Sequence, residues 1–326
     1  MSYALELDNE KSGIEDPPGS YRTAEDVVSS IPVNVASVPQ RSPFRYPGGK
    51  TWLVPYIRSW LRNRDPRPSL LIEPFAGGGI VGLTAAFEKL ADRVILVEND
   101  RNVAAVWKTI LYDQAEWLAK EIERFELTAE NVATVLAKEP SLLRERAFST
   151  ILRNRVQRGG IMARGAGLIK KGENGRGISS RWYPKTLARR IREIALVRDR
   201  LTFIEGDGVE VIRQFSDAEN VFFFVDPPYT VSARRLYQHW QIDHRLLFSL
   251  LRKVNGSVLL TYDNRAEIGS LACEFGFQTS EIAMKNSHHA TMTELLIGKD
   301  LEWLRISQAS CGSHPRNGQE KLVFLR

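Results

Sequence analysis

Short apolar runs alternate with helical patterns along most of the chain. The runs have the length of strands and lie at residues 70–72, 94–97, 201–204, 221–225, 257–262 and 293–297. Apolar residues at helical spacing follow most of these runs, at residues 80–90, 103–118 and 244–254. Continuous apolar strands that alternate with helices are typical of a parallel sheet with helices on both faces. The pattern therefore predicts an α/β fold.

The alternation is interrupted between residues 121 and 186, which we interpret as an inserted, mainly helical module. Residues 41–120 and 187–300 would then form one α/β domain on either side of the module. Residues 1–40 mix Ser, Pro, Val and acidic residues without sustained periodicity, which predicts a flexible or loosely docked leader. Residues 301–326 are left as a C-terminal extension that ends in the strand-like run "KLVFLR".

Basic charge is concentrated in one part of the chain. The net charge is +6, and residues 144–200 contain 16 Lys or Arg but only 4 Asp or Glu. A segregated basic block is typical of a protein that binds a polyanion, because each neutralised phosphate releases counterions. Leu187, Ile191 and Ile194 stand at helical spacing inside this block, so some of its arginines could simply cover the solvent side of a helix.

Membrane, secreted and metal-binding classes are disfavoured. The sequence contains no run of the roughly 18 apolar residues that a membrane span needs, and its first residues are acidic, unlike a signal peptide. Its 2 cysteines are too few for a disulfide framework or a zinc site. We expect a cytoplasmic protein without a metal centre.

A glycine-rich turn follows the first predicted strand, in "LLIEPFAGGGIVGLTAAF". Gly77, Gly79 and Gly82 match the pattern G-x-G-x-x-G, and Glu98 ends the next strand. Glycines allow a tight turn and a close approach to a ligand, while the acid can accept hydrogen bonds from ribose hydroxyls. This pattern leaves three interpretations open: a dinucleotide site, a site for another nucleoside-type cofactor, and a turn without a ligand.

The segment "FRYPGGKT" imitates the end of a phosphate-binding P-loop. That motif requires a glycine at the position of Phe44 and a strand before it, and the sequence has neither. We therefore exclude a nucleotide triphosphate site here.

The run "VFFFVDPPYT" joins a strongly apolar strand to Asp226, Pro227, Pro228 and Tyr229. The prolines end the strand, so that the Asp226 carboxylate and the Pro227 carbonyl lie at its carboxyl end, where open α/β sheets bind ligands. Two acceptors beside a flat ring suit a planar substrate with an exocyclic amino group, stacked on Tyr229. The alternative is that Asp226 caps a turn and Tyr229 packs in the core.

Four motifs together resemble the Dam-like DNA adenine-N6 methyltransferases, which use S-adenosylmethionine: "FRYPGGK", "EPFAGGG", "GDGVEVI" and "VDPPYT". The resemblance covers about residues 43–299 and includes "TELLIGK" as the closing strand. It implies a Rossmann-like, seven-stranded, mostly parallel sheet of the class I methyltransferase type, with one antiparallel strand. It also implies a target-recognition insert between the cofactor half and the catalytic half.

The resemblance implies a site for S-adenosylmethionine. Tyr46 and Lys50 would bracket the cofactor. The other positions carried over are Phe75, Ala76, Gly77 and Gly79 at the methionine end, Glu98 at the ribose, Asp207 near the adenine, and Asp226. Relatives more often have Asp at the position of Glu98 and an aromatic residue at that of Gly208, which puts the packing of the cofactor adenine there in doubt.

The catalytic motif of the family matches Asp226, Pro227, Pro228 and Tyr229. It implies direct methyl transfer to an adenine that has been flipped out of the duplex. Because the two acceptors would serve any amino group, methylation of cytosine N4 or of RNA remains an alternative. A non-catalytic DNA-binding relative and an NAD enzyme are further alternatives; the intact motif argues against the former and the absence of a hydride-transfer acid or base against the latter.

The basic block would supply contacts to double-stranded DNA. Its arginines, amides and glycines suit phosphate contacts and base-edge readout, and we expect such contacts from Asn154, Arg155, Arg158 and Arg164. The resemblance also raises a cognate restriction endonuclease as a partner. The target sequence and the oligomeric state do not follow from the sequence.

Overall fold

The computed structural model describes residues 27–29, 33–45, 49–62, 64–160, 167–172, 175–228, 242–285 and 291–304. Tyr46, Arg164 and Tyr229 of the predicted site lie outside the described residues, as does the run at 321–326.

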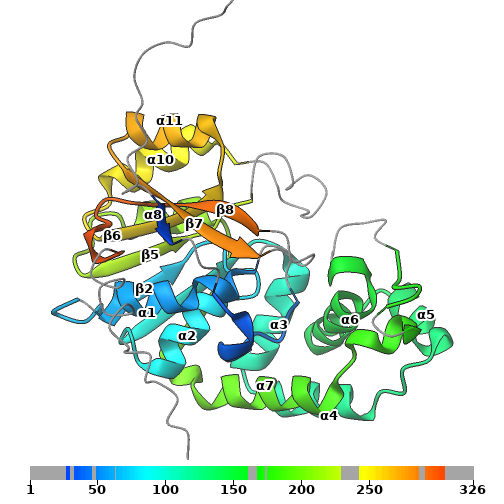
Figure 1. Cartoon of the computed structure of the whole chain (residues 1–326). Helices are drawn as coiled ribbons and strands as arrows, with labels where there is room; N and C mark the ends of the chain where they lie inside the picture. The colour runs from blue at the N-terminus through cyan, green and yellow to red at the C-terminus, as the bar shows by residue number, and fades with distance from the viewer. Residues whose placement is uncertain are drawn as a thin grey trace, which may run out of the picture.

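The centre of the molecule is a twisted sheet of eight described strands (Figure 1). Their spatial order is β1 (Val27–Ser29), β7 (Gln278–Lys285), β8 (Thr291–Gly298), β6 (Ser257–Asp263), β5 (Val221–Val225), β2 (Leu70–Glu73), β3 (Arg93–Glu98) and β4 (Leu201–Glu205). Strand β8 is antiparallel to both neighbours, and all other pairings are parallel. The predicted α/β fold, with seven strands and a single antiparallel one, is confirmed.

The leader adds one strand to the seven that the resemblance implies. Strand β1 pairs in parallel with the edge strand β7. A short 3₁₀ helix, η1 (Val35–Ser37), follows, and Val38 is buried in the hydrophobic core. These residues contact the sheet and its core, and the flexible or loosely docked leader over residues 1–40 stays a prediction.

Helices cover both faces of the sheet, because the central strands are apolar on both sides. In β5, Phe222 and Phe224 pack in one hydrophobic cluster and Phe223 and Val225 in another. The first cluster takes in α1 (Val54–Arg62), α2 (Ile80–Glu88), α3 (Arg101–Leu111), α4 (Ala115–Arg124) and α7 (Pro184–Leu196). The second takes in α8 (Gly208–Gln214), α10 (His244–Lys253) and α11 (Ala266–Glu274).

The helix predicted over residues 103–118 is two helices. Helix α3 ends at Leu111 and α4 begins at Ala115. Asp113 has a positive φ of 65° in the turn between them. Neither Gly nor Pro marks this turn, and the apolar spacing continues across it, so the sequence pattern concealed the break.

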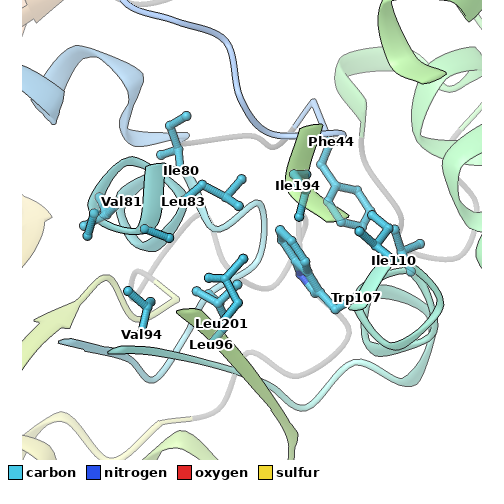
Figure 2. Packing of buried hydrophobic residues seen from close by; sticks show 14 of the residues in the cluster. Phe44, Ile80, Val81, Leu83, Val94, Leu96, Trp107, Ile110, Ile194 and Leu201 are labelled. Atoms are coloured by element: carbon cyan, nitrogen blue, oxygen red, sulfur yellow. The ribbon is translucent and has the colours of Figure 1, made fainter. Parts of the chain in front are cut away.

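The described part of residues 121–186 is mainly helical, with α5 (Ala129–Ala137) and α6 (Leu143–Val156) beside the sheet (Figure 1). Helix α6 packs against α3, and α4 packs against α7. Phe148 of α6 belongs to the same cluster as Trp107 of α3, whose ring lies near Phe44 and Ile194 (Figure 2). These helices therefore share the core of the sheet domain, and the boundaries of an inserted module stay a prediction. None of the described helices is long and apolar enough to cross a membrane.

Candidate active site

A cavity of about 720 Å³ opens at the carboxyl ends of the central parallel strands. This volume lies in the range of small-molecule sites, roughly 300–1,000 Å³. Its lining brings together these predicted residues: Lys50, Phe75, Ala76, Gly77, Gly79, Glu98, Asp207, Asp226, Pro228 and Arg155.

The glycine loop between β2 and α2 forms one wall of the cavity. Gly77 and Gly79 have φ values of 46° and 61°, which favour glycine. A Cβ atom on Gly79 would lie 2.9 Å from the Trp107 ring, and the Trp107 indole N–H donates to the Gly77 carbonyl oxygen at 3.0 Å. The loop is thus held against α3 by contacts that only glycine allows.

Glu98, at the end of β3, ties this loop to the sheet. Its Oε2 accepts from the Gly77 N–H at 3.0 Å, and its Oε1 accepts from the N–H groups of Asn99 and Asp100, both at 2.9 Å. Burial raises the pKa of Glu98 to about 7, although the backbone donors favour the charged form. The carboxyl group lines the cavity where a ribose contact is predicted, and it already organises the loop.

Glu73 is a further acid in the cavity wall that the sequence interpretation did not single out. It ends β2, is 3% exposed, and accepts from the Gly82 N–H through Oε2 at 2.7 Å. Burial raises the pKa of Glu73 to about 8, and the nearby charge of Asp226 acts in the same direction. The sequence feature that could have indicated Glu73 is an acid directly between an apolar strand and "PFAGGG".

Asp207 caps α8 and lines the cavity. Its Oδ1 accepts from the Val209 N–H at 2.8 Å, and its side chain is exposed. A Cβ atom on Gly208 would lie 2.1 Å from the Pro74 carbonyl oxygen. This close approach leaves no room for the aromatic residue of many relatives, so glycine is required at this position by the neighbouring loop.

Asp226 follows β5 and is oriented by side chains from two other segments. The Thr261 hydroxyl donates to Asp226 Oδ1 at 2.9 Å, and the Lys50 Nζ lies 3.0 Å from the same oxygen. Thr261 belongs to β6, which pairs with β5 so that Val225 faces Leu260. Thr261 was not predicted, because a fully buried threonine inside an apolar strand looks like packing.

Lys50 begins the 3₁₀ helix η2 (Lys50–Leu53) and is buried between acids. Besides Asp226, it pairs with Glu294 of β8, whose Oε2 lies 3.6 Å from Nζ. Lys50 also lines the cavity, and its contact with the cofactor stays a prediction. The same side chain contacts the Asp226 carboxylate.

Two of the predicted DNA-contacting residues are buried. Asn154 is fully buried; its Oδ1 accepts from the Arg45 N–H at 2.8 Å and its Nδ2 donates to the Arg45 carbonyl at 2.9 Å. The prediction of a base contact is therefore wrong for Asn154 in this structure, because its amide binds backbone 109 residues away.

Arg155 lies in the cavity wall and donates to the Pro43 carbonyl oxygen. Burial lowers the pKa of Arg155 to about 9, and Arg190, Arg45 and Arg181 add to this shift. Together with Asn154 it fastens residues 43–45 to α6. Arg158, in η3 (Arg158–Gly160), is exposed, and its contact with DNA stays a prediction.

Residues 46–281 match the family model of the D12 class N6 adenine-specific DNA methyltransferase. The comparison with curated proteins gives no match. Among solved structures, the rRNA methyltransferase aviRa from Streptomyces viridochromogenes is 13% identical, with a TM-score of 0.37 over 78% of this chain and 86% of that one. A methyltransferase from Geobacter sulfurreducens is also 13% identical, with a TM-score of 0.35 over 78% and 79%. The family model spans most of the chain, from the segment before Lys50 to β7, and we conclude that the chain belongs to the D12 class N6 adenine-specific DNA methyltransferases.

Proposed function

We propose that this DNA adenine methyltransferase transfers a methyl group from S-adenosylmethionine to the N6 amino group of an adenine flipped out of double-stranded DNA. The observation that supports this most is that the glycine loop and Asp226 face one cavity of about 720 Å³. A cofactor beside the loop would lie next to the acceptor that the catalytic motif supplies.

The cavity fits a nucleoside-type cofactor. The positive φ angles of Gly77 and Gly79 bring backbone to its wall. Phe75 and the glycine loop would hold the methionine end, Glu98 the ribose and Asp207 the adenine side. When bound, S-adenosylmethionine supplies a methyl group on a sulfonium sulfur.

The substrate would be held by acceptors and a stacking ring. The Asp226 carboxylate and the Pro227 carbonyl would accept the two amino hydrogens, and this reduces the conjugation of the nitrogen lone pair with the ring. The lone pair is then directed at the methyl group, so that the N–C bond would form as the S–C bond of the sulfonium breaks, and the surplus amino proton would leave to water. Much of the rate enhancement would come from orientation. Tyr229 would stack on the flipped base, which is typically worth about 1–3 kcal/mol.

Phosphate contacts would come from exposed arginines after α6. Arg158 is exposed there, and replacing it with Ala should weaken DNA binding at every sequence and reduce the salt dependence by about one unit of slope. Cofactor affinity should stay unchanged.

The test is expression of the chain in a bacterial strain that lacks adenine methylation. Single-molecule sequencing of the host DNA reports the modified base and its sequence context, and nucleoside mass spectrometry separates N6-methyladenine from N4-methylcytosine. We expect N6-methyladenine in one defined context, and none with Asp226→Ala. Methylated cytosine, methylated RNA without methylated DNA, or equal activity of the Asp226→Ala protein would contradict the proposal.

A further inference from the structure

A buried lysine connects the proposed catalytic aspartate to a second acid on another strand. Lys50 Nζ lies 3.0 Å from Asp226 Oδ1 and 3.6 Å from Glu294 Oε2. The side chains of Lys50 and Glu294 are only 2% and 8% exposed, whereas that of Asp226 is 23% exposed. Glu294 therefore contacts Lys50 from the protein interior, while Asp226 reaches the cavity.

Two acids offset the burial of this ammonium group. Removing a single charge from water costs several kcal/mol in a protein, unless close partners compensate for it. Burial lowers the pKa of Lys50, but the attraction of Asp226 and Glu294 outweighs this effect and the pKa is raised. Lys50 thus remains charged, and two carboxylates share its positive charge.

The contact of Lys50 with both acids affects how strongly Asp226 can accept a hydrogen bond from the substrate. The Thr261 hydroxyl and the Lys50 ammonium both approach Oδ1, which fixes the plane of the carboxylate. The lysine ammonium stands at the end of a flexible four-carbon stem, and a second contact restricts its position. Glu294 provides this contact and also draws part of the positive charge away from Asp226.

We propose that Glu294 is a positioning residue for methyl transfer: it holds the Lys50 ammonium so that Lys50 and Thr261 together orient the Asp226 carboxylate towards the substrate amino group. This inference rests on the proposed function, because the role is defined by the transfer step.

The first test is Glu294→Gln, which keeps the size of the side chain and removes its charge. We expect kcat to fall by about tenfold, because the Lys50 ammonium loses one of the two carboxylates that hold it, while the KM values for DNA and S-adenosylmethionine stay within about twofold. Glu281→Gln on the neighbouring strand β7 is the matched control and should keep its kcat. A Glu294→Gln protein with normal kcat would overturn the inference.

The second test is a double-mutant cycle with Lys50→Met. If Glu294 acts through Lys50, Glu294→Gln should lower kcat no further once the lysine is replaced. Independent effects that multiply in the double variant would show a general structural role and would overturn the inference.

The third test needs no activity and no cofactor. NMR titration of isotope-labelled lysines in the full chain should show a lower Lys50 pKa in Glu294→Gln than in the wild type. An unchanged Lys50 titration would overturn the inference even if the wild type methylates adenine, whereas a wild type without methyl transfer would overturn the proposed function itself.

If Glu294→Gln does not fold, Glu294→Asp replaces it in the measurement of kcat and KM. This variant keeps the charge with a shorter reach, and we expect kcat within about threefold of the wild type. A loss as large as that of Lys50→Met would then overturn the inference.

Discussion

Two carboxylates at the carboxyl ends of parallel strands are held in different ways. Glu98, after β3, accepts from three backbone N–H groups of its own turn and the adjacent glycine loop. Asp226, after β5, is contacted by the side chains of Thr261 and Lys50, which come from distant parts of the chain. The first is fixed by local backbone geometry, and the second depends on two partners that can each be removed by mutation. We therefore expect changes at Glu98 to affect cofactor binding and changes around Asp226 to affect the transfer rate.

The largest effect is expected for Asp226→Asn. The amide is isosteric but has no negative charge, and one of its two ends is a donor. Loss of a preorganised contact in the reaction should lower kcat by about 10²–10³-fold. Cofactor affinity, measured by calorimetry, should change by less than about threefold. A loss of cofactor binding as large as the loss of rate would remove the distinction between the two carboxylates.

Glu98→Ala should show the opposite pattern. It leaves three backbone donors without their acceptor, which costs about 1–3 kcal/mol for a buried group, and it removes the predicted ribose contact. We expect the Kd for S-adenosylmethionine to rise by about 30-fold and kcat at saturating cofactor to fall by less than about fivefold. Glu98→Asp, the residue of many relatives, is the control and should recover most of the affinity.

Thr261→Val tests the weaker of the two contacts to Asp226. The substitution keeps the shape of a fully buried side chain and removes only the hydroxyl donor. A hydrogen bond to a charged group is worth about 1.5–3 kcal/mol, so we expect a fall in kcat of about tenfold at unchanged cofactor affinity. Thr261→Ser should keep the donor and most of the rate. Equal rates in the Val and Ser variants would show that the hydroxyl has no part in orienting Asp226.

The smallest effect is a change in the pH dependence of stability through Glu73. Its pKa is raised to about 8, so the folded protein keeps this proton where the unfolded chain has lost it. The free energy of unfolding should therefore fall as the pH rises from about 4.5 to 8. Glu73→Gln imitates the neutral acid and should make this decline shallower, with a gain of at least about 1 kcal/mol at pH 8.

Denaturant unfolding of wild type, Glu73→Gln and the exposed control Glu302→Gln at pH 5 and 8 measures this difference. Parallel pH profiles for all three proteins would contradict the raised pKa.

The features that the sequence predicted well are those encoded locally. The run at β5 is apolar at every position because it is buried on both faces, and the acid and prolines that end it follow directly in the chain. The glycine loop is equally local, since the strand, the turn and α2 are contiguous. The cavity-lining residues of these two motifs could be named for this reason.

The features that the sequence did not predict depend on contacts between distant segments. Glu294 and Thr261 stand in apolar strands, where the sequence does not indicate that Glu294 meets Lys50 or that Thr261 meets Asp226. Asn154 stands in a basic segment and looked like a surface residue, but its amide completes the backbone hydrogen bonding of Arg45. Only the packing of α6 against the sheet domain reveals that Asn154 binds the Arg45 backbone.

The attachment of Asn154 to Arg45 has a consequence for protein engineering. A designer who wants a new DNA specificity would exchange the recognition segment between homologues and would naturally cut at residue 121, where the sequence rhythm changes. Such a graft would carry α6 along and would replace the amide that binds the Arg45 backbone. Chimeras joined after Gly160, whose carbonyl oxygen accepts a third bond from the Asn154 amide, would keep this fastening intact and exchange only the residues beyond it.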